Sequence, residues 1–356
     1  MHDLTALLGI RHPIVLAPFG GLSSVALTAA VSAGGGLGSY GLYGYDGERI
    51  RATAAALRRA TSAPFSLNIW LPTGDEVRPG PEHDGYARGL AALFAEVGIQ
   101  PPPAPEQYLP TVEEQLDAIW EAAPAVLSVV FGVPPVSAVD EAHRRGIRVL
   151  GTATTVAEAV ALADGGVDAI VATGAEAAGH RASFLRSAEE SLVGLVSLVP
   201  QVVDAVDVPV IAAGGIGDRR GVAAAFALGA SGVQVGTSFL VTRESAANDA
   251  HRAAIRSTAA DGSVLTRAMS GRPARGVPNR AVREIEASGA IAPFPAQNWL
   301  TGRFRSIAGQ RGLGELQSLW LGQSAPLARW DAAAEVLAEL RAGIPGSGPR
   351  DVRVRG

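Results

Sequence analysis

The chain has 356 residues, of which 47% are hydrophobic but only 5% aromatic. Its 30 Lys and Arg residues against 34 Asp and Glu residues give a net charge of −4, which argues against sequence-independent binding to nucleic acid or an anionic membrane. The chain has no cysteine, so disulfides, thiolate metal sites and a cysteine nucleophile are excluded.

The start of the chain has neither the basic segment nor the apolar run of a signal peptide. No apolar stretch approaches the ~20 residues of a membrane-spanning helix. Because only 5% of the residues are aromatic, the core must be filled by Ala, Val, Leu and Ile. Such a core is typical of parallel strands and their covering helices. We therefore expect a soluble, cytoplasmic α/β protein whose partner is a small molecule, with no nucleic acid and no membrane.

Short apolar runs alternate along the chain with Ala-rich segments of helical length. Two of these segments begin with a Thr-x-x-Glu capping box, from Thr111 to Glu114 and from Thr155 to Glu158. Alternation of this kind requires right-handed crossovers and a parallel sheet, and eight strands favour closure into a (β/α)8 TIM barrel. The eight predicted strands are residues 13–17, 36–40, 65–69, 126–131, 147–151, 169–173, 208–213 and 232–235.

Two regions depart from this alternation. Residues 71–110 are rich in Pro and Gly, contain a predicted helix over 86–97, and form a long insertion typical of a lid or rim. After Thr237 the strands stop, which predicts a second, smaller, mostly helical domain. We expect a barrel over 1–243 with a lid-like insertion at 71–110, a helical substrate-side domain over 244–317, a segment returning to the barrel over 318–346, and a frayed tail over 347–356.

Glycine clusters follow the last two predicted strands. In a parallel barrel the ligand lies beyond the carboxyl ends of the strands. Gly214 and Gly215 follow the seventh strand, and Gln234-Val235-Gly236-Thr237 ends the eighth. Glycines let a phosphate approach the backbone amides, and the helix expected from about Arg219 would add its positive dipole end. A tight turn explains either cluster alone, but the pair predicts the phosphate site that barrels often build there.

The loop after the sixth strand holds the candidate catalytic residue, His180. Histidine can donate, accept or exchange a proton near neutral pH, and the glycines at 174 and 179 would let it approach a planar ligand. Its place at a strand end favours a functional role. A structural or exposed role is the simpler interpretation for the other histidines, at positions 2, 12, 83, 143 and 251.

Other strand ends carry weaker candidates. Asn68 offers a donor and an acceptor, which suits the imide edge of a flavin ring, although an Asn that satisfies its own turn is equally consistent. Ser128 lies in the fourth strand and residues 17–19 follow the first. Arg272 and Arg275 could bind an anion, but exposed arginines are common, so we interpret them as solvated surface residues.

Together these motifs resemble the nitronate monooxygenase family, formerly called 2-nitropropane dioxygenases, which are FMN-dependent barrels. The similarity covers nearly the whole chain. The segments that carry it are residues 13–18, 67–68, 128–134, 151–155, the His180 loop, 212–216, 234–237, 270–276 and 319–323.

The resemblance implies FMN as cofactor and an anionic nitronate as substrate. The flavin would take an electron from the nitronate and pass it to O2, which yields a carbonyl compound and nitrite. His180 would face the flavin from the substrate side, where it positions the anion or removes the α-proton of a neutral nitroalkane. A homodimer is left open. The implied cofactor-binding residues are Ala17, Pro18, Phe19, Asn68, Ser128, Thr173, Ala178, Gly179, Gly214, Gly215, Gln234, Val235, Gly236 and Thr237.

Three positions depart from the family pattern. Thr173 and Ala178 replace Gln and Gly in the motif Gln-Gly-x-Glu-Ala-Gly-Gly-His, and Phe19 stands where the family often has Met. Two alternatives stay open. An FMN-dependent NAD(P)H reductase of enoyl thioesters or quinones is similar in its barrel, flavin and loop histidine, and the changes at Thr173 and Ala178 allow a catalytically silent flavin-binding protein. A reductase needs a nicotinamide, and no Gly-x-Gly-x-x-Gly follows a strand to supply a second dinucleotide fold.

Overall fold

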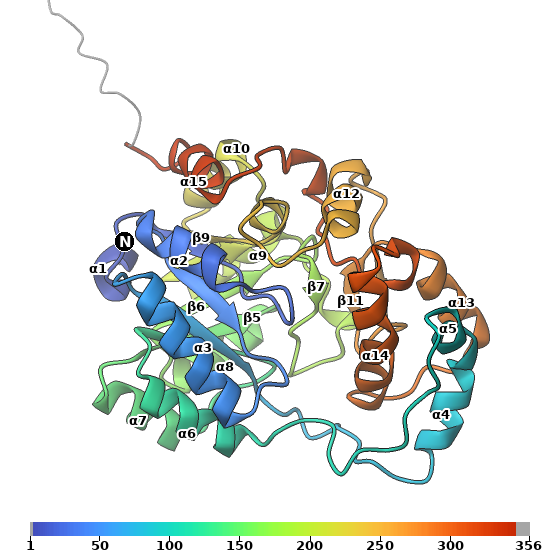
Figure 1. The fold of residues 1–356 in the computed structure, drawn as a ribbon. Coiled ribbons are helices and arrows are strands. Elements are labelled where there is room, and N and C mark those ends of the chain that lie inside the picture. The colour runs from blue at the N-terminus through green and yellow to red at the C-terminus, as the bar shows by residue number, and fades with distance from the viewer. Residues whose placement is uncertain (1–2, 347–356) are drawn as a thin grey trace, which may run out of the picture.

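The computed structural model describes residues 3–346, in which eight parallel strands form a barrel (Figure 1). The order around it is β1-β9-β8-β6-β5-β4-β3-β2, and a bridge between Val15 and Leu37 closes the ring. The TIM barrel and all eight predicted strands are confirmed. The strands are β1 (Ile14–Leu16), β2 (Gly38–Gly41), β3 (Phe65–Trp70), β4 (Val126–Val130), β5 (Arg148–Ala153), β6 (Ala169–Thr173), β8 (Val210–Ala213) and β9 (Gly232–Val235).

Helices cover the outside of the barrel, as the alternation predicted. One of them, α15, comes from the end of the described chain and packs against α2, α10 and β1. The predicted frayed tail, 347–356, and His2 lie outside the described residues. The covering helices are α2 (Val25–Ala33), α3 (Gly47–Ala60), α6 (Val112–Ala122), α7 (Val136–Arg144), α8 (Val156–Asp164), α9 (Leu195–Ala205), α10 (Arg219–Ala227) and α15 (Ala333–Arg341).

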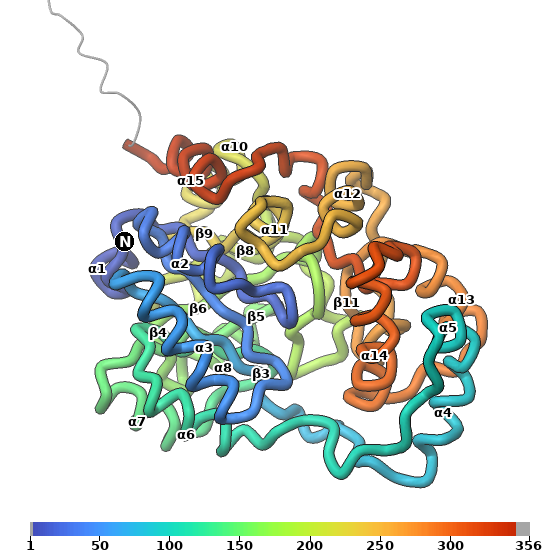
Figure 2. Tube along the Cα trace, viewed as in Figure 1, coloured from blue at the N-terminus to red at the C-terminus, as the bar shows by residue number. Residues whose placement is uncertain are grey.

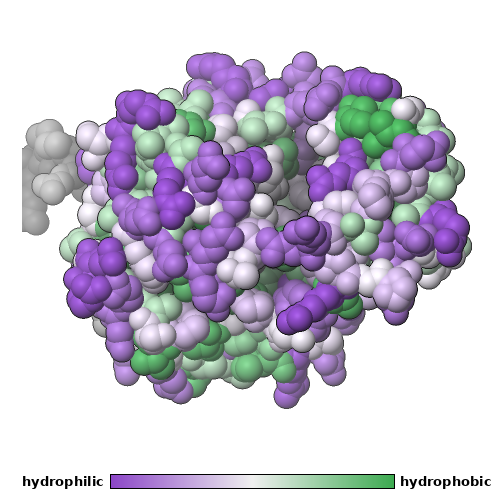
Figure 3. All heavy atoms as spheres, turned by 60° about the horizontal axis from the view of Figure 1, so that its bottom comes forward, coloured by the Kyte–Doolittle hydropathy of each residue, from purple (hydrophilic) through white to green (hydrophobic). Residues whose placement is uncertain are grey.

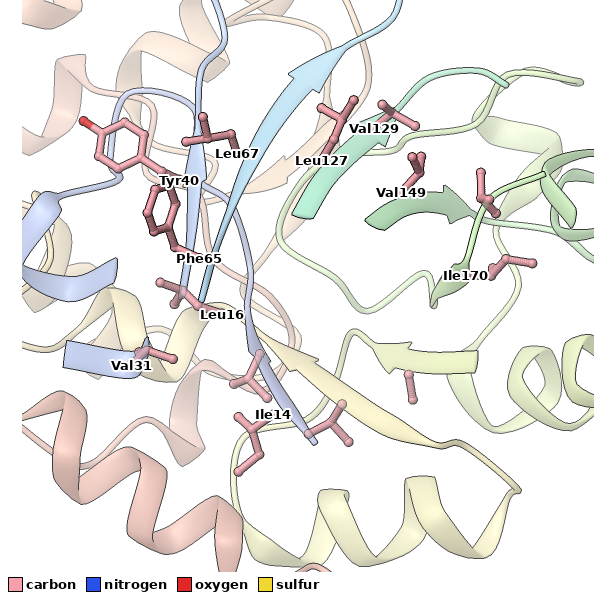
Figure 4. Packing of buried hydrophobic residues seen from close by; sticks show 14 of the residues in the cluster. Ile14, Leu16, Val31, Tyr40, Phe65, Leu67, Leu127, Val129, Val149 and Ile170 are labelled. Atoms are coloured by element: carbon pink, nitrogen blue, oxygen red, sulfur yellow. The ribbon is translucent and has the colours of Figure 1, made fainter. Parts of the chain in front are cut away.

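Successive strand residues point into two different apolar layers. Ile14 and Leu16 pack with helix residues such as Val31 in the outer layer, part of which Figure 4 shows. Val15, between them, belongs to an inner cluster with Leu4 and Leu8. Because side chains alternate along a strand, the inner positions near the carboxyl ends are the ones that can line a site.

The amino ends of the strands are filled by α1 (Leu4–Leu8). A Cβ added at Gly232 would come 2.5 Å from Leu4 Cδ2, so β9 needs a glycine where the helix meets it. Asp3 caps α1 by accepting hydrogen bonds from the amides of Thr5 and Ala6. The inside of the barrel is thus filled from the amino ends of its strands.

The two capping motifs do start helices, but each forms only half of a box. Thr111 and Thr155 accept the amide three residues on, at the starts of α6 and α8. Their glutamates bond elsewhere: the buried Glu158 carboxylate accepts the amides of Thr154 and Phe184, each at 2.7 Å. Glu158 therefore ties the end of β5 to the loop that follows His180.

A second lobe lies beside the barrel. It contains α4 (His83–Gly89), α5 (Ala91–Glu96), α13 (Arg280–Ser288) and α14 (Ala296–Gln310). Figures 1 and 2 show α4 and α5 next to α13 and α14, and Phe94 and Phe304 share one buried cluster. The insertion at 71–110 is thus packed into this lobe through its helices.

The single helix predicted over 86–97 is wrong, because the chain forms α4 and α5 with a break at Leu90. Leu90 has φ −105° and ψ 0°, outside the helical range, and its side chain is buried. The break lets Leu90, Leu93 and Phe94 enter the same apolar cluster. Packing against the second lobe has overridden the local helical pattern.

A small antiparallel sheet joins the lobe to the barrel. It pairs β7 (Gly179–His180) with β11 (Ala274–Gly276), and β11 with β10 (Val264–Thr266). His180 lies opposite Ala274 in this register. The sequence did not predict this sheet, because strands of two or three residues are too short to show periodicity.

The surface seen in Figure 3 is largely hydrophilic, with hydrophobic residues in separate patches. Within residues 3–346, no helix combines the length and the apolar character needed to cross a bilayer.

Candidate active site

A cavity of about 780 Å³ lies at the carboxyl ends of the barrel strands. Pockets for small ligands commonly fall in this range of size. Its walls also include α14 and residues 317–324. The cavity brings together these sequence-predicted site residues: Ala17, Pro18, Phe19, Asn68, Ser128, Thr173, Ala178, Gly179, His180, Gly214, Gly215, Gln234, Gly236 and Thr237.

Val235 is the one predicted site residue that does not line this cavity. Its side chain is buried in the outer apolar layer, and its carbonyl accepts the amide of Ala17 at 2.9 Å. Gln234 and Gly236, on either side, do line the cavity. The alternation of side chains along the strand therefore removes Val235 from the site.

Gly214 and Gly215 form a cradle for an anion. Both have left-handed backbone conformations, with φ +100° and +70°. Within the described chain, neither amide donates a hydrogen bond. Two adjacent free amides with no side chain in the way are a typical binding site for phosphate.

The start of α10 does not add to this cradle as expected. Asp218 caps the helix, and its carboxylate accepts the amide of Arg220 at 2.9 Å. Hydrogen bonds from Arg220 lower the pKa of Asp218, so the carboxylate stays charged. The positive end of α10 is therefore already neutralised by the protein itself.

The loop after β6 is held from two sides. The side-chain carboxylate of Glu176 accepts a hydrogen bond from the amide of Leu195, at the start of α9, at 2.9 Å. The backbone carbonyl of Glu176 accepts one from the amide of Gln323 at 3.0 Å. Gly322 passes so close that a Cβ there would come 2.8 Å from the Glu176 carbonyl oxygen. The segment around Gly322 thus closes over the loop that leads to His180.

Arg181 fixes the same loop from inside. Its buried guanidinium donates to the carbonyls of Gly174 at 2.6 Å, Thr173 at 3.2 Å and Ser191 at 3.2 Å. The Thr173 hydroxyl, in contrast, is buried without a partner on the wall of the cavity. Buried polar groups are almost always hydrogen-bonded, so this hydroxyl is available for a ligand.

Asn68 is oriented by Ser128 on the neighbouring strand. Its Nδ2 donates to the Ser128 carbonyl at 3.1 Å and to Oγ at 3.0 Å. Since both amide hydrogens are used, the Oδ1 acceptor is the atom that Asn68 can offer to a ligand in the cavity.

His180 sits at the end of β7 in an aromatic environment. Its ring centroid lies 4.8 Å from that of Trp70 and 5.6 Å from that of Trp320. Burial, followed by the charges of Arg272 and Arg305, lowers the pKa of His180 to about 3. The imidazole is therefore neutral at physiological pH.

Ser270 is the hydrogen-bond partner of the His180 ring. His180 Nε2 lies 2.8 Å from Ser270 Oγ, and that hydroxyl donates to the carbonyl of Arg272 at 3.0 Å. When the single hydroxyl proton of Ser270 points to the Arg272 carbonyl, Oγ accepts from His180 Nε2–H. His180 Nδ1 is then the nitrogen with a free lone pair.

Aromatic side chains that the sequence did not single out form the wall next to His180. Trp70 packs 4.3 Å from the ring of Tyr43 and 4.8 Å from that of Phe131. Phe131 has φ +72°, which is uncommon for a bulky residue and typical of strained functional sites. Trp70 lies two positions after Asn68 in β3, so the period of the strand places both on the inner face.

The interpretation of Arg272 and Arg275 as surface residues is wrong, because both are buried. The Arg272 guanidinium lies 4.0 Å from the ring of Phe294 and pairs with Asp75 and Glu76. Arg275 donates to the carbonyl of Ala175 at 3.1 Å. Arg275 lies in β11 opposite Gly179, whereas Arg272 is covered by the segment that carries Asp75 and Glu76 and by Phe294, so contacts between distant segments bury both.

Three other described histidines, at positions 83, 143 and 251, make structural contacts. His83 Nδ1 lies 2.9 Å from the Tyr108 hydroxyl, and His143 pairs with Asp168. His251 lines the cavity, but its Nε2 is occupied by the carbonyl of Trp320 at 2.8 Å.

Known proteins resemble this chain over nearly its full length. The family model described as nitronate monooxygenase matches residues 2–343. A nitronate monooxygenase of Pseudomonas aeruginosa is 41% identical over 342 residues, which cover 94% of this chain and 97% of that protein. The structure of nitroalkane oxidase from Streptomyces ansochromogenes has a TM-score of 0.86 at 34% identity, covering 97% of this chain and 99% of that one. FabK from Thermotoga maritima has a TM-score of 0.74 at 29% identity, covering 95% and 94%.

Proposed function

The chain belongs to the nitronate monooxygenase family, and we propose that it binds FMN in the cavity and oxidises alkyl nitronates with O2 to a carbonyl compound and nitrite. The observation that carries this proposal is the position of a neutral His180 in the same cavity as the free amides of Gly214 and Gly215. The same cavity thus offers free amides that suit a phosphate and an imidazole for a substrate.

Three features support FMN as the ligand. The amides of Gly214 and Gly215 suit its phosphate, the unpartnered Thr173 hydroxyl needs an acceptor or donor, and the Asn68 Oδ1 acceptor suits an imide N–H. The cavity of about 780 Å³ leaves room for a substrate beside the cofactor. When bound, FMN would supply the redox chemistry, accepting electrons from the substrate and passing them to O2.

The state of His180 favours a nitronate over a neutral nitroalkane as substrate. General bases work best when their pKa lies near the working pH, and burial holds the pKa of His180 near 3. Such an imidazole removes an α-proton poorly. A nitronate has already lost this proton, so we infer that His180 Nδ1 mainly positions the substrate.

The aromatic wall gives the reacting centre a dry environment. The rings of Tyr43, Trp70 and Phe131 contact one another in series and reach His180. Apolar side chains at this place keep water away from the substrate carbon and strengthen electrostatic interactions with its charge.

The test is a comparison of substrates on the FMN-loaded protein. We expect rapid nitrite release from freshly prepared ethyl nitronate, slower release from nitroethane, and no rapid bleaching of the flavin when NADH or NADPH is added anaerobically. Fast bleaching by a nicotinamide without nitrite release would instead identify a reductase. Protein that cannot be reconstituted with FMN would reject every flavin-dependent reading.

A variant assigns the role of His180 in the same assay. We expect His180→Ala to lose most nitrite release while it keeps FMN, because the imidazole contacts the substrate side of the cavity. The matched control is His143→Ala, whose ring pairs with Asp168 on the outside of the barrel. Full turnover by His180→Ala would reject the histidine assignment and leave the cofactor assignment in place.

A further inference from the structure

Arg305 lies on the face of α14 that lines the cavity. Asn298, Gly302 and Gly309 line the same wall, and their spacing places them with Arg305 on one side of the helix. The guanidinium lies beside Gly302, where an added Cβ would be 3.6 Å from Arg305 Nη2, an ordinary van der Waals contact. This wall is formed by the second lobe and faces the barrel.

The guanidinium of Arg305 is held by neutral groups alone. Nη1 donates to Ser318 Oγ at 2.7 Å, and Nη2 donates to the Asn298 carbonyl at 3.1 Å and to its Oδ1 at 2.7 Å. Nε is buried without a partner. None of the ion pairs formed by residues 3–346 includes Arg305. An uncompensated buried cation is costly unless an anion completes it.

The other arginines near the cavity are already satisfied or exposed. Arg272 is neutralised by Asp75 and Glu76. Arg49 lines the cavity but is exposed, with its guanidinium 3.6 Å above the ring of Tyr45. Among the described residues that line the cavity, Arg305 is therefore the half-buried cation, with a buried Nε, that lacks a counterion.

Arg305 and His180 enclose the same aromatic compartment. Asn298, which holds Arg305, donates to the Tyr43 hydroxyl at 2.8 Å. Tyr43 packs on Trp70, which in turn contacts His180. The positive charge of Arg305 is also one of the causes that lower the pKa of His180. A substrate beside His180 therefore lies within the field of Arg305.

A second unmet donor lies on the same wall. Nε2 of Gln317 is buried and has no partner among residues 3–346, while its Oε1 accepts from Asn248 Nδ2 at 2.7 Å. Gln317 lines the cavity and directly precedes Ser318, the residue that holds Arg305. Two unmet donors on one wall suit a ligand group with more than one acceptor oxygen.

From these contacts we propose that Arg305 is the substrate-binding cation of this enzyme, which holds the anionic nitro group of a nitronate and thereby selects nitronates over neutral nitroalkanes. The inference rests on the proposed function. It assigns the charge recognition to α14 of the second lobe, and it leaves to the uncharged His180 only the positioning of the reacting carbon.

The test measures by calorimetry how tightly propionate binds to the FMN-loaded protein. Propionate has the shape and charge of ethyl nitronate but is not oxidised. Propionamide is the uncharged analogue of the same shape. We expect Arg305→Gln to weaken propionate binding roughly 10- to 100-fold, as for loss of a charge-assisted hydrogen bond, with little change for propionamide. Arg305→Lys keeps the charge and should retain part of the preference.

Arg303→Gln is the matched control, because Arg303 lies on the same helix but stacks on Trp299 at 4.2 Å, away from the cavity. It should leave both affinities unchanged. In turnover, Arg305→Gln should raise the KM for ethyl nitronate by a similar factor and change that for nitroethane little. If Arg305→Gln does not fold, Gln317→Glu takes its place, because it keeps the oxygen that accepts from Asn248. The negative charge that it places on this wall should weaken the binding of propionate but not that of propionamide.

Two results would overturn the inference. One is unchanged propionate affinity in Arg305→Gln, or in Gln317→Glu where that variant replaces it. The other is loss of FMN from Arg305→Gln with no selective effect on the anion, which would make Arg305 a cofactor contact. Failure of the proposed function looks different, because the unaltered protein would then release no nitrite from ethyl nitronate.

Discussion

His180 Nε2 lies 2.8 Å from Ser270 Oγ, although the two residues are 90 positions apart in the chain. The contact joins the loop after β6 to the turn that precedes β11. Because Ser270 Oγ also lies 3.0 Å from the Arg272 carbonyl, the turn holds the imidazole in one orientation. The position of the candidate catalytic residue is thus set by the second lobe as well as by the barrel.

Ser270→Ala is expected to lower the rate of nitrite release from ethyl nitronate about 10-fold, because the variant loses one hydrogen bond and frees the ring of His180. FMN affinity should not change. Steady-state nitrite assays and flavin fluorescence titrations check the two expectations. Ser257→Ala, an exposed serine of α12 (Asp249–Ser257), serves as control. Unaltered turnover in Ser270→Ala would mean that the barrel loop alone orients the imidazole.

The low pKa of His180 makes a prediction about acid stability. Burial and two nearby arginines lower the pKa from the ordinary 6.5 to about 3 in the folded chain, so the unfolded chain takes up this proton first as the pH falls. The contribution of the neutral His180 to the free energy of unfolding is therefore fully present above pH 6.5 and is lost progressively as the pH falls from 6.5 to about 3. His180→Gln, which cannot titrate, should therefore be less sensitive to acid in this window.

Urea unfolding of the FMN-free protein at several pH values between 4 and 8 tests this expectation. The difference in free energy of unfolding between His180→Gln and the unaltered chain should change below about pH 6.5 and stay constant above it. A difference that does not vary with pH would show that His180 titrates normally in the folded chain.

Thr173→Val should separate cofactor binding from folding. Valine has nearly the shape of threonine but lacks the hydroxyl, which has no partner within the described chain. Removing it should leave the FMN-free protein as stable as before, or more so, while FMN affinity falls by up to about 10-fold. Thermal melts and FMN titrations measure the two effects, and Thr173→Ser is the control that keeps the hydroxyl. Equal FMN affinity in Thr173→Val would place the hydroxyl outside the cofactor site.

Gly215→Ala tests the anion cradle. A side chain at φ +70° is strained by about 1 kcal/mol, and its methyl group would project beside an amide that is free to bind phosphate. Gly146→Ala is a matched control, since Gly146 has φ +73° and lies exposed with nothing within 4 Å of its added Cβ. Both variants should lose similar stability, but only Gly215→Ala should bind FMN more weakly, by roughly tenfold. Equal FMN affinities in the two variants would argue against phosphate binding at Gly215.

The sequence by itself determined the barrel and much of its ligand-facing edge. Eight apolar runs separated by helical segments allow few chain arrangements. The glycines after β8 and Asn68 in β3 could be predicted as site residues because the ends of all strands meet at one edge of a parallel barrel. The helix starts at Thr111 and Thr155 were equally visible, since capping is a local interaction. Such features depend on neighbours along the chain.

The tertiary structure alone decided the substrate side of the cavity. Arg305 carries no local pattern that marks it, and the segments that contain Ser270 and Trp320 do not reveal their contact with His180. Arg272 and Arg275 were interpreted as surface residues, but the folded chain buries both. The single helix expected over 86–97 broke for the same reason, when packing against α13 and α14 outweighed its local pattern. Burial, charge compensation and contacts between segments far apart in the sequence arise only when the second lobe packs against the barrel, and they determine which residues meet the substrate.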